Sequence, residues 1–255
     1  MNKVLLEKCD GYAVVSLNRP DEMNALSREL REDFVEAFAE CQSDESIRVV
    51  IVTGKGRAFC AGFDLKELSA PDAGDASETG DNIIARAMEA FEGPIIAAVN
   101  GHAVTGGFEL ALACDVIIAS ENARFADTHA RVGILPGWGL SQRLPRLIGL
   151  SRAKELSLTG LPLFADKAYE WGLVNRVVPA DELLDAAEAI AKEMCACVPH
   201  IMREYTQLID KGFSMPLDEA LVYEEGVAIE SAKNAAASLL ATRREKVVSQ
   251  GREEK

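Results

Sequence analysis

The chain has 255 residues, the length of one large domain or of one domain with an appendage. Its composition, 48% hydrophobic and 27% charged residues, is that of a globular protein and excludes disorder of the whole chain. Acidic residues outnumber basic ones by 41 to 27, and the net charge of -14 would repel a phosphate backbone, which argues against nucleic acid as a partner.

The cysteines and the apolar runs bear on the compartment. The six cysteines are scattered, which fits neither a disulfide scaffold nor paired zinc knuckles and predicts a reducing compartment. No apolar stretch follows a basic N-terminal start, and no run of about 18 apolar residues occurs. We therefore expect a cytoplasmic protein without a membrane span.

The first elements predicted along the chain are a hairpin and a helix. Two apolar runs, 4–9 and 12–17, join through Asp10-Gly11, a pair that readily takes the positive φ angles of a tight turn. Ser27 then precedes apolar residues at helical spacing, so we expect it to cap an amphipathic helix.

Buried strands follow the predicted helix. Residues 48–53 and 95–99 are nearly unbroken runs of β-branched or small apolar residues, as in strands buried on both faces. Residues 107–114 predict a short buried helix, and residues 116–119 predict a further strand. Residues 69–82 are small, polar and acidic, and they predict a loop. The alternation of strands and helices predicts an α/β core.

Helices dominate the last part of the chain. The predicted elements are a helix at 166–171 ended by Gly172, a strand at 173–178, a long alanine-rich helix capped by Asp181, and helices near 217–232 and 235–249. We expect a helical C-terminal appendage, and no internal repeat is visible in the sequence.

Two glycine-containing turns come directly after buried strands, at residues 54–64 and 100–110. Neither has the Gly-Lys-Ser/Thr of a phosphate loop or the Gly-x-Gly-x-x-Gly spacing of a dinucleotide turn. The chain also contains no Gly-x-Ser-x-Gly elbow and no His-Glu-x-x-His, and its three histidines are well separated. These absences argue against NTPases, nicotinamide enzymes, serine hydrolases and zinc proteases.

The second turn could stabilise a negative charge. Gly106 and Gly107 open a predicted helix, whose first amides lack intrahelical partners. Glu109 lies three residues after Gly106 and so on the same helical face, which would place a base beside a charge stabiliser. The alternative is that the two glycines only permit close packing and that Glu109 is a favourable acid in a first helical turn.

Several short motifs occur in order along residues 4–195. They are Leu17-Asn18-Arg19-Pro20, Asn24-Ala25-Leu26, residues 58–65 (AFCAGFDL), residues 100–110 (NGHAVTGGFEL) with Cys114-Asp115, residues 133–137 (GILPG), Gln142-Arg143-Leu144 and residues 171–178 (WGLVNRVV). Together they resemble the enoyl-CoA hydratase/isomerase, or crotonase, superfamily. Motifs in this order are specific for the superfamily but not for one of its reactions.

The resemblance implies an α/β fold with a spiral core of repeated ββα units and a C-terminal helical region. Residues 1–195 would form the acyl-CoA-binding catalytic core, and residues 196–255 would serve oligomerisation and cover the site. It also implies a homotrimer or homohexamer and an acyl-CoA thioester substrate. No cofactor beyond the coenzyme A of the substrate, and no metal, is implied.

The resemblance also assigns catalytic residues. The amides of Ala61 and Gly106 would hold the thioester oxygen, on which negative charge develops during the reaction. Glu109 matches the first catalytic glutamate of the hydratases, and His129 stands at the position of the second. Two interpretations of His129 remain open: it completes a Glu/His acid-base pair, or it is a structural histidine packed beside Asp127 or Arg131.

Residues of the first turn are assigned to coenzyme A and to the architecture of the site. By the resemblance, Ala25, Asp64 and Leu65 would bind near the adenine end, and Lys66 would place positive charge there. Asp64 could also cap the turn that begins at Leu65, with Glu67 as its capping-box partner. Cys60 is interpreted as a small buried hydrophobe rather than as a nucleophile.

These residues lead to one function with open alternatives. The leading hypothesis is an enoyl-CoA hydratase, a hydro-lyase that reversibly adds water to a trans-2-enoyl-CoA through an oxyanion-stabilised enolate. A double-bond isomerase needs only one base and is a close alternative. A non-hydrating acyl-CoA-binding protein is another, because His129 replaces the second glutamate. Decarboxylase, hydrolase and dehalogenase activities have no dedicated signal in the sequence.

Overall fold

The computed structural model describes residues 2–68, 82–234 and 244. Contacts divide the chain into two compact units, Met1–Met202 and Arg203–Lys255. Nearly all of the loop predicted at residues 69–82, and the helix predicted at 235–249 apart from Arg244, lie outside the described residues. No helix in the described ranges is long and apolar enough to cross a membrane.

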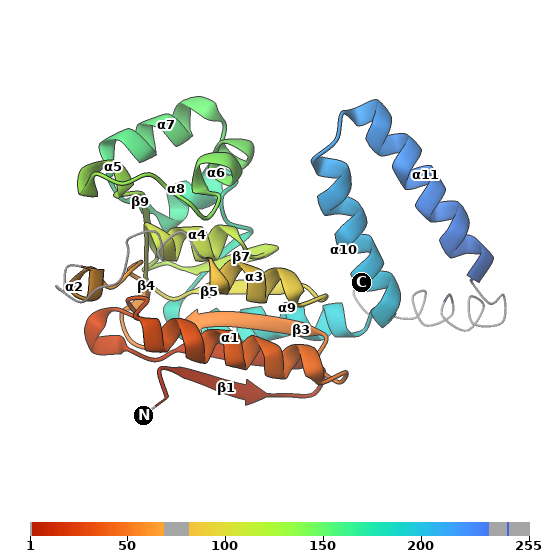
Figure 1. Cartoon of the computed structure of the whole chain (residues 1–255), viewed down its shortest axis with the longest axis horizontal. Helices are drawn as coiled ribbons and strands as arrows, with labels where there is room; N and C mark the ends of the chain where they lie inside the picture. Colours follow the sequence, from red (N-terminus) through yellow and green to blue (C-terminus); the bar gives the residue numbers. More distant parts are fainter. Residues whose placement is uncertain (1, 69–81, 235–243, 245–255) are drawn as a thin grey trace. The chain divides into compact units, whose positions relative to one another are not determined.

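A six-stranded sheet forms the centre of the first unit (Figure 1). Its strands lie in the order β1 (Val4–Lys8), β2 (Tyr12–Leu17), β3 (Val49–Gly54), β5 (Ile95–Val99), β7 (Val116–Ser120) and β10 (Arg176–Val178). β1 is antiparallel to β2, whereas the other neighbours are parallel. Every residue of β3 and β5 is buried, which confirms the prediction of strands covered on both faces.

A second sheet supplies the edge from which the site is built. Its strands are β4 (Ala58–Cys60), β6 (His102–Val104), β8 (Arg124–Ala126) and β9 (Leu163–Phe164), in that order. The first three are parallel, and β9 is antiparallel to β8. None of these strands is predicted from the sequence, because two or three residues are too few to display an alternation of apolar and polar side chains.

The chain passes between the two sheets in repeated ββα units. The units are β3–β4–α3 (Ile83–Ala90), β5–β6–α4 (Gly106–Leu112) and β7–β8–α5 (His129–Val132), with α2 (Leu65–Leu68) inserted after β4. The first strand of each unit joins the main sheet and the second joins the other sheet. This arrangement confirms the fold class that the resemblance implies.

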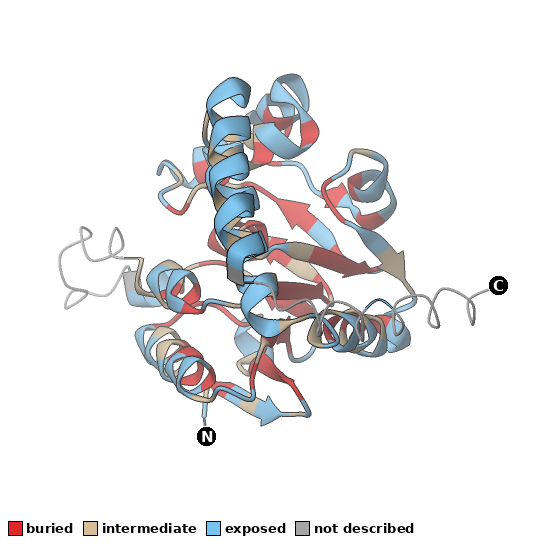
Figure 2. Cartoon of the chain, turned by 90° about the vertical axis from the view of Figure 1, so that its right-hand side faces the viewer, coloured by how far each residue is buried: buried red, intermediate tan, exposed pale blue. Residues whose placement is uncertain are grey.

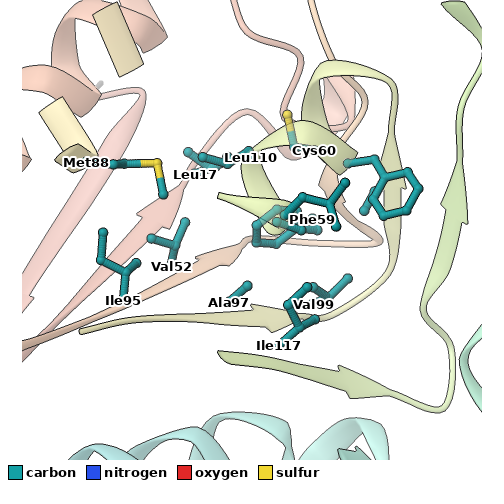
Figure 3. Packing of buried hydrophobic residues seen from close by; sticks show 14 of the residues in the cluster. Leu17, Val52, Phe59, Cys60, Met88, Ile95, Ala97, Val99, Leu110 and Ile117 are labelled. Carbon is teal, nitrogen blue, oxygen red and sulfur yellow. The ribbon is translucent and has the colours of Figure 1, made fainter. Parts of the chain in front are cut away.

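Two hydrophobic clusters cover the two faces of the main sheet. One lies between the sheets, where Val52, Ala97 and Val99 of the main sheet face Phe59 of β4 and Leu110 of α4 (Figure 3). The other lies under α9 (Leu183–Cys195) and includes residues of β3, β5 and β7. The strands between the helices are accordingly buried, while the helices expose their outer faces (Figure 2).

Four further helices of the first unit lie between the strands along the chain. α1 (Arg28–Ser43) precedes β3, α6 (Leu140–Ile148) and α7 (Leu150–Thr159) lie between β8 and β9, and α8 (Ala165–Glu170) follows β9. Short 3-10 turns occur at Pro20–Glu22 and Ala180–Glu182. The described C-terminal residues are helical, as expected, in α10 (Pro199–Phe213) and α11 (Leu217–Asn234).

Two local predictions need correction. The strand expected at 173–178 is shorter, because the Leu173 amide donates to the Ala168 carbonyl and still belongs to the end of α8. Asp181 does not cap α9 but lies inside the preceding 3-10 turn, and Glu182 occupies the N-cap without a side-chain bond. Both errors concern junctions where one turn runs directly into the next element.

The predicted cap of α1 is present and can be tested. The Ser27 Oγ accepts a hydrogen bond from the Leu30 amide at 3.2 Å, in a buried position. We expect Ser27→Ala to lower the free energy of unfolding by about 1 kcal/mol, measured by urea denaturation. Ser43→Ala, at the exposed end of the same helix, is the control and should change it little. Equal effects of the two substitutions would contradict a role for the cap.

Candidate active site

Three turns leave the same edge of the second sheet. Because β4, β6 and β8 are parallel, their carboxyl ends meet there. The turns that follow contain residues 61–64, residues 105–106 and residues 127–129. The tertiary structure thereby brings together Gly106, Glu109 and His129, which come from two different turns.

Close approach of backbones explains the glycines at this edge. A Cβ at Gly62, where φ is 86°, would lie 2.9 Å from the Val104 carbonyl oxygen and 3.1 Å from the Gly106 nitrogen. A Cβ at Gly107 would lie 2.0 Å from the Cys60 carbonyl oxygen. The interpretation that the glycines permit close packing is thus correct for Gly107. The same packing brings the Gly106 amide close to the first turn.

The Ala61 amide is not available to a ligand. It donates a hydrogen bond to the Met23 carbonyl oxygen at 3.0 Å. An amide that is already paired cannot also point at a thioester oxygen, so the assignment of Ala61 as the partner of Gly106 is corrected.

The geometry favours the neighbouring amide of Phe63 as the partner of the Gly106 amide. A parallel bridge joins Leu26 to Phe63, and its bonds run from the Leu26 amide to Gly62 and from the Asp64 amide to Leu26. The Phe63 N–H therefore points away from the bridge. Its nitrogen lies 3.7 Å from the point that a Cβ on Gly106 would occupy. Sequence reasoning missed Phe63, because a lone amide has no signature in the side chains.

Thr105 sets the direction of the Gly106 amide. Its φ of 54° and ψ of -113° are unusual for a β-branched residue and indicate backbone strain. The Thr105 amide donates to the Ala126 carbonyl at 2.9 Å, and its hydroxyl is hydrogen-bonded to that of Thr128. These bonds to the β8 segment hold the peptide that carries the Gly106 N–H.

Glu109 is buried and held by backbone amides. Its side chain is 2% exposed, and Oε1 accepts hydrogen bonds from the amides of Trp138 at 2.7 Å and Leu140 at 3.3 Å. The second oxygen, Oε2, lies 3.6 Å from Nε2 of His129. A favourable acid in a first helical turn would need none of these partners, so the packing interpretation does not account for Glu109.

His129 lies between two carboxylates. Its Nδ1 is 2.7 Å from Oδ1 of Asp127, and its Nε2 faces Glu109. Burial disfavours the charged ring, but the hydrogen bond to Asp127 and the facing carboxylate of Glu109 outweigh this effect and raise the pKa of His129 to about 9. Burial raises the pKa of Asp127, and the bonds from His129 more than compensate, so this pKa is lowered. At neutral pH the ring is therefore an imidazolium.

An aromatic pair joins the first turn to the segment that holds Glu109. The rings of Phe63 and Trp138 pack edge to face with their centroids 4.9 Å apart. The Phe63 amide belongs to the first turn, and the Trp138 amide holds Glu109. The sequence analysis did not single out Trp138, because its contribution to Glu109 comes from the backbone.

The residues assigned to coenzyme A form one cluster at the first turn. The Arg19 Nη1 donates to the Ala25 carbonyl at 2.7 Å and to Asp64 Oδ2 at 2.9 Å. Burial raises the pKa of Asp64, but the bond from Arg19 outweighs this effect, and the pKa is lowered. Leu65 is 53% exposed, and Lys66 is exposed beside it. The structure therefore brings all four assigned residues together, with Arg19 as a connection that the sequence did not reveal.

The capping box predicted at this turn is incomplete. Asp64 Oδ1 accepts from the Lys66 amide at 3.1 Å, as expected of a cap. Glu67 does not reach back to Asp64, because its Oε2 accepts from the Arg28 amide at 2.8 Å. Glu67 thereby ties the first turn to the start of α1.

Two other titratable residues are not organised for catalysis. Burial raises the pKa of the Cys60 thiol to about 12, so it stays protonated and acts as a small hydrophobe. His102 lies at the start of β6, at the other end of the strand from the three turns. Within residues 2–68 and 82–234, no group of three acidic, histidine or cysteine side chains could hold a metal ion.

Comparisons with known proteins identify the family and the fold. The family model described as "Enoyl-CoA hydratase/isomerase" matches residues 7–242. The chain is 45% identical over 215 residues to "Probable enoyl-CoA hydratase 1, peroxisomal" of Arabidopsis thaliana, covering 84% of this chain and 81% of that protein. It is 39% identical to the short-chain-enoyl-CoA hydratase of Clostridium acetobutylicum, with 88% and 87% covered. The crystal structure of an enoyl-CoA hydratase from Bacillus anthracis superimposes with a TM-score of 0.88 at 37% identity, covering 96% of both chains.

The close contact at Gly107 can be tested by one methyl group. We expect Gly107→Ala to lower the free energy of unfolding by about 2 kcal/mol or more, because its Cβ would meet the Cys60 backbone. The melting temperature should fall accordingly. Gly226→Ala is the control, since Gly226 also lies in a helix and has open space around it. Its substitution should cause no loss, since alanine is the better helix former. A neutral Gly107→Ala would contradict the close approach of α4 to β4.

Proposed function

The chain belongs to the enoyl-CoA hydratase/isomerase family, and from this premise we propose that it reversibly adds water to a trans-2-enoyl-CoA. The chain is an acyl-CoA enzyme of the hydro-lyase type. The observation that carries the assignment is the buried pair Glu109 and His129, whose facing atoms are 3.6 Å apart. Glu109 lies in the first turn of the helix that begins at Gly106, whose backbone approaches the Phe63 nitrogen.

The two amides explain the affinity of the site for an enolate. Attack of water on the β-carbon of an enoyl thioester pushes negative charge onto the thioester oxygen. The Phe63 and Gly106 N–H groups are held in place by the backbone, so they need no reorganisation to stabilise this charge. Each donor of this kind typically contributes about 3 kcal/mol to the transition state.

Glu109 and His129 supply the proton transfers. The Glu109 oxygen that no amide holds can accept a proton from water, and the ring of His129 lies on the other side of it. One group takes a proton while the other provides one, as the addition of water across a double bond requires. Both interpretations of His129 thus apply in part: Asp127 holds the ring, and the ring faces the base.

Isomerisation remains the second candidate because the family description includes it. An isomerase moves one proton between two carbons and needs a single base, which Glu109 alone could provide. The buried histidine favours hydration, because this reaction needs a second group that donates a proton, and a protonated His129 can donate one.

The substrate carries its own coenzyme A, and we propose that no further cofactor is needed. Ala25, Asp64, Leu65 and Lys66 would meet the nucleotide end. The exposed Lys66 offers the positive charge there that a phosphate requires. A reducing, cytoplasmic location remains a prediction.

A homotrimer or homohexamer is proposed for the assembly. Large apolar side chains are exposed in both units; among them are Leu135 at 90%, Leu158 at 73%, Phe213 at 71% and Leu217 at 76%. These exposed apolar side chains are available for contact with other copies of the chain. Light scattering should give the mass of three or six chains, and the mass of a single chain would refute the assembly.

The activity test uses crotonyl-CoA and a longer trans-2-enoyl-CoA. Loss of the conjugated thioester absorbance and a product heavier by one water are expected from the wild type. Glu109→Gln should lower kcat/KM at least about 100-fold while acyl-CoA binding persists, because only the proton acceptor is lost. Glu170→Gln, at the exposed end of α8, is the control and should retain activity. A shifted double bond without added water would favour the isomerase instead.

A further inference from the structure

We propose that Asp127 is a positioning residue that makes His129 the proton donor of the site and leaves Glu109 as the proton acceptor. The inference deepens the proposed hydration and rests on it. It assigns a role to a carboxylate that lies behind the histidine and does not reach the substrate.

The first observation is the double contact of one carboxylate oxygen. Asp127 Oδ1 accepts from the His129 backbone amide at 3.1 Å and lies 2.7 Å from the ring Nδ1. The Asp127 side chain is 3% exposed, so water does not compete for this oxygen. The orientation of the ring is therefore set, and Nδ1 carries a proton because its partner is an acceptor.

The second observation is the acceptor on the opposite side of the ring. Nε2 faces Glu109 Oε2, and Glu109 cannot turn away because Trp138 and Leu140 amides hold its other oxygen. A ring with a carboxylate at each nitrogen is stable when both nitrogens are donors, which is the imidazolium form. The raised pKa of His129 agrees with this conclusion.

Other nearby charges do not face the ring. Arg131 of α5 donates to the Thr159 carbonyl, and Arg143 of α6 donates to the Trp138 carbonyl. On α7, Arg152 lies over the Trp171 ring, and Lys154 and Glu155 are exposed. In the described part of the chain, Asp127 and Glu109 are the two ionisable groups that set the charge of His129.

The proposed step balances with these two groups. Water gives a proton to Glu109 Oε2 as its oxygen bonds to the β-carbon, and the electrons of the double bond move into the enolate. The enolate re-forms the thioester carbonyl as the α-carbon takes the proton from His129 Nε2. The proton on Glu109 then passes to Nε2, which restores both groups. The sum is one water added, and the reverse order removes it.

This division of labour predicts a distinct pH dependence. The active form needs Glu109 ionised and His129 protonated, so kcat/KM should fall as pH rises through a pKa of about 9. The Asp127→Asn substitution keeps the shape of the side chain but removes its negative charge. The alkaline limb should then move down by about one pH unit or more, since one unit corresponds to about 1.4 kcal/mol of lost interaction.

The kinetic test compares the wild type with Asp127→Asn and Asp127→Glu between pH 6 and 10. We expect the loss of kcat/KM in Asp127→Asn to be at least about threefold larger at pH 8.5 than at pH 6.5, as a shift of one unit from a pKa of about 9 requires, and Asp127→Glu to restore part of the alkaline limb. A loss that is equal at all pH values would show a structural role only and would overturn the inference.

A second readout does not depend on turnover. Nitrogen-15 NMR of histidine-labelled protein follows His102, His129 and His200, and His129→Asn identifies the signal. The His129 midpoint should be near 9 in the wild type and lower in Asp127→Asn. A wild-type midpoint below about 7 would overturn the inference whether or not the variants fold. If the midpoints are as expected but the protein does not hydrate enoyl-CoA, the positioning of His129 by Asp127 is supported. Only the hydratase proposal is then contradicted.

Discussion

The parallel pairing of three short strands is the constraint on which the site depends. β4, β6 and β8 contain three residues each, and their pairing brings the ends of three successive ββα units to one edge. The Phe63 and Gly106 amides come from the first two turns, Glu109 from the helix after the second, and Asp127 and His129 from the third. A shift of one residue in this pairing would turn each of these groups away from the others.

Packing and strain at this edge serve the chemistry as well as the fold. Gly62 and Gly107 permit backbone contacts that no side chain would allow, and Thr105 is held in an unfavourable conformation by hydrogen bonds to the β8 segment. The local cost is offset by the buried core between the two sheets (Figure 3). The Phe63 and Gly106 amides, which we propose to stabilise an enolate, are therefore held by the surrounding backbone.

The buried charges of the site form a connected set. Asp127, His129 and Glu109 are all nearly inaccessible to solvent, and one cation between two carboxylates satisfies all three. A lone carboxylate at Glu109 would be costly to bury, so the histidine lowers the cost of keeping Glu109 ionised. The same arrangement allows a histidine to stand where the family resemblance places a second glutamate.

Much of the fold and part of the site are determined by the sequence itself. The hairpin at Asp10-Gly11, the helix capped by Ser27 and the strands buried on both faces follow from local rules of turn geometry, capping and burial, and the family motifs imply the ββα fold. Tertiary structure alone decided that the Ala61 amide is bound to Met23, that Phe63 stands beside Gly106 and that His129 meets Glu109. The physical reason is that the availability of an amide and the charge of a buried ring depend on partners contributed by other strands and turns, which no local pattern records.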